Sequence, residues 1–216
     1  TPYHHCLYAD QQMPAPGWWE TISKVCKQED LILISDDVRA GFRLDMAGSH
    51  AYFGYEPDLV CYSKAIANTY PISAGLGTKK LKETAEHVLF TGTFFSSMVP
   101  MAASIATVKE LQRLDGINYM MKIGKALCDG LVSVGKSNGF EIVMSGPYDI
   151  PFMRFAREKN FMLKQLFSGE AAIRGVIFHP HHNWFTSCAH TEEDVKKSLE
   201  VADIAFKKVK EKYGSD

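Results

Sequence analysis

Short apolar runs alternate with amphipathic stretches along most of the chain. The runs Leu31–Ile34 and Leu59–Tyr62 have the length and unbroken hydrophobicity of fully buried strands. Further strand patterns are predicted at residues 71–77, 88–90, 141–144, 151–155 and 175–178. Helical periodicity occurs at residues 18–26, 79–87, 100–114, 117–134, 160–167 and from 191 onward. Strands that alternate with helices predict an α/β fold with a mostly parallel sheet.

The helical pattern breaks at Asp115-Gly116, and we place a domain boundary directly after it. Residues 1–116 are predicted to form part of a larger sheet domain, and residues 117–216 a small α+β domain. Thr191 and Asp194 have the spacing of a capping box at the start of the last helix. The apolar face of this helix is predicted from Val195, Leu199, Ala202 and Phe206.

The sequence also predicts one loop and the buried faces of two helices. Residues 48–57 are aromatic and contain glycine, which predicts a loop on the side of an active site. Side chains predicted to face a core are Trp18, Ile22, Val25 and Cys26 in the first helix, and Met162, Leu163 and Leu166 in the helix at 160–167. Trp18 and Trp19 are assigned to the core rather than to ligand stacking.

Composition narrows the class of protein. Among 216 residues, 24 are basic and 25 are acidic, so the chain lacks the basic surplus typical of nucleic-acid binding. The five cysteines, at 6, 26, 61, 128 and 188, have no paired spacing, which predicts reduced thiols. No apolar stretch reaches membrane-spanning length and no signal peptide is recognised. We therefore expect a soluble, cytoplasmic protein.

Candidate chemistry follows the two strongest strand patterns. Asp36 and Asp37 come at the end of the first, and Lys64 follows the second. Taken singly, aspartates at a strand end are usually turn formers, and a lysine there is usually a solvated cap. In open α/β sheets, however, ligands bind at the carboxyl edge, where these strands would end together. A carboxylate and a lysine at that edge suit a cofactor with one cationic nitrogen and one aldehyde.

These residues also lie in longer motifs that resemble a known family. Residues 36–43, Asp-Asp-Val-Arg-Ala-Gly-Phe-Arg, are similar to the D-E-V-x-x-G-F-R motif of class III aminotransferases. Their P-D-L…S-K-A-I-A-N-G-Y-P-I lysine segment resembles residues 57–59 and 63–72. Residues 91–94 with 100–103 resemble their phosphate-contacting turn and the following helix, and residues 185–194 resemble the ending of glutamate-1-semialdehyde aminomutase. The motifs occur in the family's order over nearly the whole chain.

The resemblance implies a fold type I transferase that depends on pyridoxal 5'-phosphate (PLP). Lys64 would form the internal aldimine and then transfer protons, and Asp36 would keep the pyridine nitrogen protonated. Val38 would pack against the ring, while Gly92 and Thr93 would hold the phosphate, in this family commonly that of the partner subunit in a homodimer. The implied reaction moves an amino group between an amino acid or amine and a keto acid or aldehyde.

Departures from the family pattern keep alternatives open. Asp37 replaces a glutamate, Thr69 replaces a glycine, and residues 94–99 depart from the usual run. The loop 181–184 has no acidic residue, which argues against the alternative of an aminomutase; a racemase or decarboxylase would share the same cofactor chemistry.

The resemblance further implies that family members are about twice as long, with a phosphate loop and a cofactor-stacking aromatic residue in their first half. A fragment or non-catalytic dimerisation module is therefore the second hypothesis, and we expect an exposed sheet edge and an uncovered apolar face.

A run of histidines and three arginines are further candidates for binding. His179-Pro180-His181-His182 lacks a nearby acidic or cysteine ligand, so we expect a surface loop or a lip of the substrate pocket rather than a metal site. Arginine is suited to binding a substrate carboxylate, and the candidates are Arg43, Arg154 and Arg174.

Overall fold

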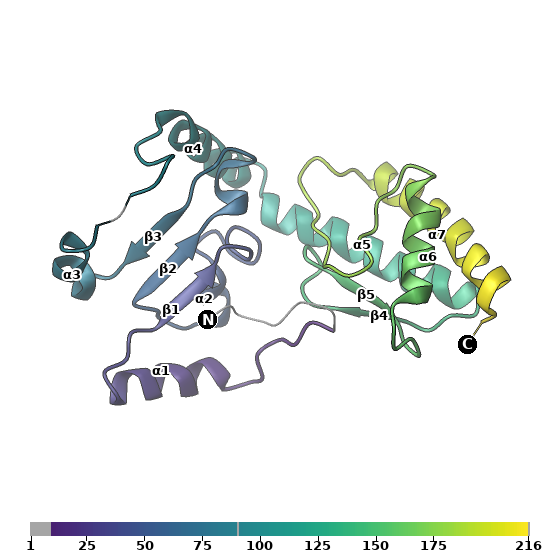
Figure 1. Ribbon diagram of the computed structural model, residues 1–216, viewed down its shortest axis with the longest axis horizontal. Coiled ribbons are helices and arrows are strands. Elements are labelled where there is room, and N and C mark those ends of the chain that lie inside the picture. The colour runs from purple at the N-terminus through teal and green to yellow at the C-terminus, as the bar shows by residue number, and fades with distance from the viewer. Residues whose placement is uncertain (1–9, 90, 216) are drawn as a thin grey trace. The chain divides into compact units, whose positions relative to one another are not determined.

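The computed structural model describes residues 10–89 and 91–215 (Figure 1). The chain divides into two compact units. Among the described residues, the first unit consists of residues 13–89 and 91–117, and the second of residues 10–12 and 118–215. Each unit has its own sheet and its own hydrophobic core.

The first unit is built on a three-stranded sheet in the order β1-β2-β3. Strands β1 (Ile34–Asp37) and β2 (Leu59–Tyr62) are parallel, with Asp36 opposite Cys61 and Asp37 opposite Tyr62. Strand β3 (Ala74–Gly77) pairs antiparallel with β2. Because β1 and β2 are parallel and in this register, their carboxyl ends meet at one edge of the sheet.

The helices of the first unit confirm the patterns predicted at 18–26, 79–87 and 100–114. They are α1 (Trp18–Gln28), α2 (Ser49–Phe53), η1 (Lys64–Ala67), η2 (Lys79–Leu81), α3 (Lys82–Glu86) and α4 (Met98–Arg113). Proline is tolerated in the first turn of a helix, where its missing amide has no partner to lose. Pro100 occupies that position in α4, and α4 packs against η1.

Three predictions for the first unit were wrong. The run at 31–34 is not a fully buried strand, because β1 begins at Ile34, and Leu31, Ile32 and Ile34 are exposed. An apolar run is buried only where other segments of the chain cover it, and the run itself does not show whether such a cover exists. Residues 48–57 contain the helix α2. Residues 88 and 89 are irregular, and Phe90 lies outside the described residues.

The tryptophans of α1 behave differently from each other. Trp19 is buried and stacks on Tyr55 with ring centroids 3.8 Å apart, as expected for a core residue. Trp18 is 52% exposed and Val25 is 43% exposed, so the predicted core face of this helix is wrong at these positions. In α1, the buried tryptophan is Trp19, one position after the predicted Trp18.

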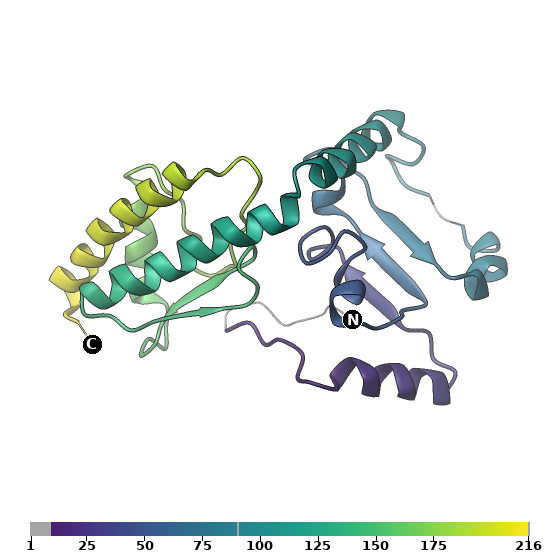
Figure 2. The same cartoon turned by 180° about the vertical axis from the view of Figure 1, so that it is seen from behind.

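The second unit packs long helices around a hairpin. Strands β4 (Ile142–Ser145) and β5 (Phe152–Phe155) pair antiparallel. The helices are α5 (Gly116–Ser137), α6 (Met162–Ala172) and α7 (Glu192–Tyr213), and α5 and α7 run side by side in both views (Figures 1 and 2). The core is rich in phenylalanine and includes Phe140, Phe155, Phe167, Phe178 and Phe206.

In the C-terminal part of the second unit, the predictions for α7 are confirmed, whereas those for residues 175–178 and for Met162 are wrong. Thr191 and Asp194 form both hydrogen bonds of a capping box, and Val195, Ala202 and Phe206 of α7 are buried. The strand predicted at 175–178 is irregular, with Phe178 buried and Ile177 85% exposed. Its residues alternate in burial as in a strand, but they pair with no strand among the described residues. Met162, predicted to be in the core, is 47% exposed.

Candidate active site

Asp36 and Lys64 lie at the same edge of the first unit's sheet. Asp36 is the third residue of β1, and Lys64 comes two residues after the end of the adjacent parallel strand β2. Both side chains are on exposed residues. A carboxylate oxygen of Asp36 accepts a hydrogen bond of 3.1 Å from the backbone N–H of Val38, which follows the strand. The structure therefore places three of the predicted site residues at this edge.

The backbone around Lys64 adopts unusual angles. Lys64 has a φ of 45°, in the left-handed region that normally favours glycine. The residue before it is anchored, because the Ser63 hydroxyl donates a 3.1 Å hydrogen bond to the carbonyl of Ile72. Ile66 and Ala67, which follow in η1, are buried. Such backbone strain persists where the surrounding structure holds it, and it is common at functional sites.

Asp37, unlike Asp36, is buried. Successive strand residues point to opposite faces of a sheet, and Asp37 is 0% exposed. Its carboxylate accepts hydrogen bonds from the Ser49 amide at 2.6 Å and from the Ser49 hydroxyl. The Ser35 hydroxyl lies 3.4 Å from it. The Tyr55 hydroxyl is 2.7 Å from Ser35 Oγ and 3.2 Å from Ser49 Oγ, which completes a buried polar cluster.

Two tyrosines, Tyr55 of this cluster and the neighbouring Tyr62, stay protonated at neutral pH. Burial, the nearby Asp37 carboxylate and the Tyr55 hydroxyl raise the pKa of Tyr62 to about 12. Burial also raises the pKa of Tyr55, although hydrogen bonds with Ser35 and Ser49 oppose the shift. Tyr62 donates its hydroxyl hydrogen to the carbonyl of Ala47 at 2.5 Å. Both phenols are therefore hydrogen-bond donors at neutral pH rather than bases.

The predicted phosphate turn lies elsewhere in the first unit. Gly92 and Thr93 are exposed and precede α4, and the Gly92 carbonyl accepts a 2.9 Å hydrogen bond from the Phe95 amide. Figure 1 shows this segment on the β3 side of the sheet, whereas Asp36 and Lys64 belong to β1 and to the end of β2. The structure therefore does not bring the turn together with the other predicted site residues.

Two of the three candidate arginines are already paired with acids of their own unit. Arg154 donates two hydrogen bonds to Asp10, at 3.0 and 2.7 Å. Arg174 binds the Glu170 carboxylate at 2.7 Å, one turn away on α6. Neither guanidinium is open to bind a substrate carboxylate without breaking its ion pair.

The loop of residues 179–182, which contains three histidines, forms hydrogen bonds within itself and with neighbouring residues. The Trp184 indole donates to the His179 carbonyl at 2.9 Å, and the His181 amide donates to His179 Nδ1 at 3.1 Å. Burial and the other two histidines lower the pKa of His179. In the part of the chain that the structure describes, no group of three or more histidine, cysteine or acidic residues could hold a metal ion.

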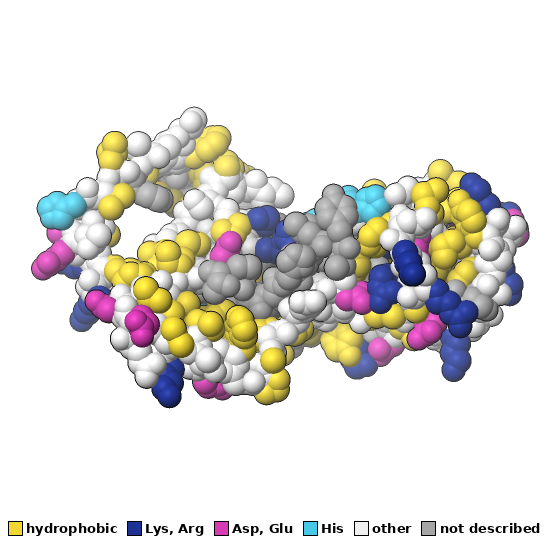
Figure 3. Space-filling model, turned by 60° about the horizontal axis from the view of Figure 1, so that its bottom comes forward, with side chains coloured by type: hydrophobic (Ala, Val, Ile, Leu, Met, Phe, Trp, Pro, Cys, Tyr) yellow, Lys and Arg dark blue, Asp and Glu magenta, His cyan; other side chains and the backbone are white. Residues whose placement is uncertain are grey.

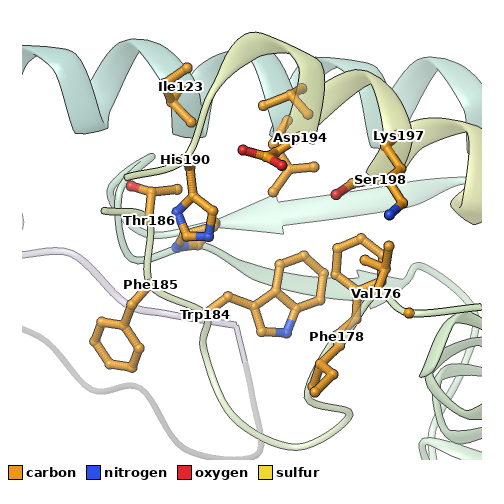
Figure 4. Close-up of a pocket in the computed structure, with 15 residues that line it drawn as sticks. Ile123, Val176, Phe178, Trp184, Phe185, Thr186, His190, Asp194, Lys197 and Ser198 are labelled. Atoms are coloured by element: carbon orange, nitrogen blue, oxygen red, sulfur yellow. The ribbon is translucent and has the colours of Figure 1, made fainter. Parts of the chain in front are cut away.

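A separate cavity of about 350 Å³ lies within the second unit. Figure 4 shows Phe178 and Trp184 on one side of it and Asp194, Lys197 and Ser198 of α7 on the other. None of the residues predicted from the sequence to bind the cofactor lines this cavity.

The geometry agrees with comparisons of the whole sequence. Residues 11–145 match the family described as aminotransferase class-III, and the chain belongs to that family. The match includes Asp36, Lys64 and the turn at 92–93.

Several curated proteins are similar over most or all of the chain. An aminopentol aminotransferase of Sphingopyxis macrogoltabida is 37% identical over 215 residues, which cover 100% of this chain and 51% of the relative. A glutamate-1-semialdehyde 2,1-aminomutase of Desulfatibacillum aliphaticivorans is 30% identical over 91% of this chain and 50% of its own length. The chain thus spans about half the length of the curated relatives it matches.

Solved structures show the same fold. The FumI protein of Sphingopyxis sp. MTA144, in its PLP internal aldimine form, is 36% identical and superposes with a TM-score of 0.96 over 100% of this chain and 52% of that one. An omega-transaminase from Sphaerobacter thermophilus has a TM-score of 0.84 at 17% identity, over 93% of this chain and 50% of its own, which supports the fold alone. The fold is that of the fold type I PLP-dependent transaminases.

Proposed function

We propose that this chain supplies the lysine-bearing part of a PLP-dependent aminotransferase. The observation that carries the proposal is the placement of Asp36 and Lys64 at the carboxyl edge of two adjacent parallel strands, in a chain of the class III family. The donor set fits the cofactor, because it offers a primary amine for an aldehyde and a carboxylate for a cationic ring nitrogen. When bound, PLP supplies an electron-withdrawing ring that stabilises negative charge on the substrate carbon.

Each residue would have a distinct task. The Lys64 amine would hold the cofactor covalently and carry a proton on Nζ, which requires a fraction of neutral amine. The Asp36 carboxylate would accept a hydrogen bond from the protonated ring nitrogen. Val38 would limit the position of the ring, and Gly92 and Thr93 would bind the phosphate. Because that turn lies on the β3 side of the sheet, its assignment to a partner subunit's cofactor, and with it a homodimer, is part of the proposal.

An amine is favoured as the amino donor over an amino acid. The relative at 37% identity is named an aminopentol aminotransferase. In addition, Arg154 and Arg174, two of the three candidate arginines, are already ion-paired with acids of this chain. We therefore propose a hydroxylated primary amine as donor and a keto acid or aldehyde as acceptor. The aminomutase alternative is supported by relatives of that name at 30% identity or less.

The proposed cellular setting and domain division have supporting observations. Cys26, Cys61, Cys128 and Cys188 are free thiols, which supports a reducing compartment such as the cytoplasm. Among the described residues, no helix is long and apolar enough to cross a membrane. We also propose residues 1–116 and 117–216 as the parts of the large and small domains; the helix break at residue 115, with a φ of 48°, supports a boundary there.

Borohydride reduction after incubation with PLP tests the assignment of Lys64. We expect peptide mass mapping to find the reduced adduct at Lys64, and Lys64→Ala to abolish it. Lys79→Ala, which removes another exposed lysine, serves as the matched control and should leave labelling of Lys64 unchanged. Equal labelling of surface lysines in the parent chain and in Lys64→Ala would contradict the proposed role.

A further inference from the structure

Two carboxylates hold β1 in place, one at each end. At the amino end, an oxygen of Asp58 accepts a 2.9 Å hydrogen bond from the Leu33 amide. At the carboxyl end, Asp37 accepts hydrogen bonds from the amide and the hydroxyl of Ser49, the first residue of α2. The second anchor lies next to Asp36, so it has a direct bearing on the proposed cofactor site.

We propose that Asp37 is a positioning residue, which fixes the carboxyl end of β1 and thereby the direction of the Asp36 carboxylate. The inference rests on the proposed function of Asp36 for its chemical meaning. It assigns no contact between Asp37 and the cofactor, because Asp37 points to the opposite face of the sheet and is fully buried.

The anchor acts on the peptide that joins the two aspartates. The side chain of Asp37 is tied to α2, and its backbone carbonyl accepts a 2.8 Å hydrogen bond from the Gly41 amide. The Asp36 carboxylate is in turn bonded to the Val38 amide at 3.1 Å. Asp36 and Asp37, on either side of the peptide bond that joins them, are therefore both held by hydrogen bonds, and the end of β1 has little freedom to rotate. Asp36 consequently keeps one orientation.

The space around the Asp37 carboxylate is closed. A β-carbon added at Gly48 would lie 2.3 Å from Asp37 Oδ2 and 2.9 Å from the Tyr62 hydroxyl oxygen, and Gly48 has a φ of 109°. The backbone therefore approaches the carboxylate more closely than any other residue at 48 would allow. A glutamate at position 37 would need room for one more methylene group.

Hydrogen bonds surround the buried side chain of Asp37. Among the described residues, no lysine or arginine forms an ion pair with it, and its bonded partners are the Ser49 amide and the hydroxyls of Ser49 and Ser35. A buried carboxyl group with a small set of donors also holds those donors in place, since the loss of any donor leaves a buried polar atom unpaired. Asp37 and α2 consequently behave as one unit.

Amide hydrogen exchange on the cofactor-free chain tests the inference directly. We expect Asp37→Asn to speed exchange of the Val38 and Gly41 amides at least tenfold and to leave the Leu33 amide unchanged. Asp58→Asn is the matched control, which should speed exchange at Leu33 and leave Val38 and Gly41 unchanged. If Asp37→Asn does not fold, Ser49→Ala removes the hydroxyl donor alone and should give the same pattern more weakly. Unchanged exchange at Val38 in both variants would overturn the inference.

A second readout connects the anchor to cofactor binding. Relative to the parent chain, Asp37→Asn is expected to weaken PLP binding at least tenfold and to shift the pH midpoint of the visible absorption band of the bound PLP. Asp58→Asn should change neither the affinity nor the midpoint. Equal effects of both variants would assign Asp37 a purely structural role and overturn the inference. Failure of the proposed function is recognised separately, because the parent chain would then form no adduct at Lys64 while the exchange pattern persists.

Discussion

At the scale of single residues, left-handed backbone angles accumulate in the segment after β2. Lys64, Asn68 and Thr69 have φ values of 45°, 43° and 84°. Asparagine tolerates this region, but a β-branched threonine does so at a real energetic cost. Thr69 also occupies the position where the family motif has glycine.

We expect Thr69→Gly to stabilise the first unit. Relief of the strain is worth about 1–3 kcal/mol, and the greater freedom of glycine in the unfolded chain returns roughly 0.5–1 kcal/mol of that gain. The midpoint of urea unfolding should therefore rise. Asn68→Gly is the control and should change it less. A lower midpoint for Thr69→Gly would show that the threonine side chain contributes more than the strain costs.

A second residue of interest is Lys164, which is fully buried in the second unit. Its ammonium nitrogen makes no hydrogen bond within the described part of the chain and lies 3.7 Å from the centre of the Phe152 ring. The Trp184 and Phe161 rings are 5.6 and 6.0 Å away. Burial lowers the pKa of Lys164 to about 7, against the opposing effect of Glu158 and Asp10.

This buried amine predicts a pH-dependent stability. Between pH of about 7 and 10.5, the unfolded lysine holds a proton that the folded one has lost, so the free energy of unfolding should rise with pH in that window. Below this range the destabilisation is complete and constant. Lys164→Met should remove the slope and stabilise the second unit by a few kcal/mol at neutral pH.

Urea unfolding at several pH values checks this prediction, with Lys196→Met on the exposed face of α7 as the control. The control should retain the slope of the parent chain. A parallel pH dependence in Lys164→Met and the parent would show that Lys164 is not the group responsible.

At the scale of elements, glycines decide how closely α5 approaches its neighbours. A β-carbon at Gly124 would lie 1.9 Å from the Tyr148 carbonyl oxygen, and one at Gly130 would lie 2.3 Å from a methyl group of Leu199. The first obstacle is backbone and cannot move aside, whereas the second is a flexible side chain. In α6, a β-carbon at Gly169 would meet nothing within 4 Å.

Alanine substitutions at these glycines should therefore have opposite effects. Gly124→Ala should lower the stability of the second unit by about 2 kcal/mol or more, because the helix must move away from the loop at Tyr148. Gly169→Ala should raise it by roughly 1 kcal/mol, the difference in helix propensity. Thermal unfolding of both variants is the measurement, and destabilisation of similar size in both would refute the steric argument.

At the scale of the whole molecule, many large apolar side chains are exposed. Figure 3 shows hydrophobic side chains gathered on the first unit, where Leu31 is 52%, Leu76 60% and Leu89 89% exposed. This agrees with a chain that spans about half the length of its curated relatives. Apolar patches of this kind are usually covered by another polypeptide.

We expect the isolated chain to self-associate through this surface. Sedimentation should give a mass above the 24.2 kDa of one chain, and the mass should rise with concentration. Replacing Leu31 and Leu76 with lysine should reduce the association. Ile204→Lys, which adds a charge to the exposed face of α7 in the second unit, should have a smaller effect. A chain that stays monomeric at high concentration would contradict this prediction.

Much of the proposed site could be predicted from the sequence because its signals are local. Asp36 follows an apolar run, Lys64 follows another, and the family motifs extend over both. The Asp37 cluster was missed, although a signal existed: Ser35 is two residues before Asp37 and so shares its face of the strand. Ser49 and Tyr55 could not be assigned to it, since they come from a segment predicted to be a loop.

By itself, the sequence determined the order of most helices and strands, the capping box of α7 and the candidate chemistry, because these depend on residues close together along the chain. Only the tertiary structure decided that Asp37 is buried while Asp36 is exposed, that residues 175–178 form no strand, and that Leu31 and Ile32 remain uncovered. Burial and strand pairing depend on partners contributed by distant segments. No local pattern of hydrophobic residues contains that information.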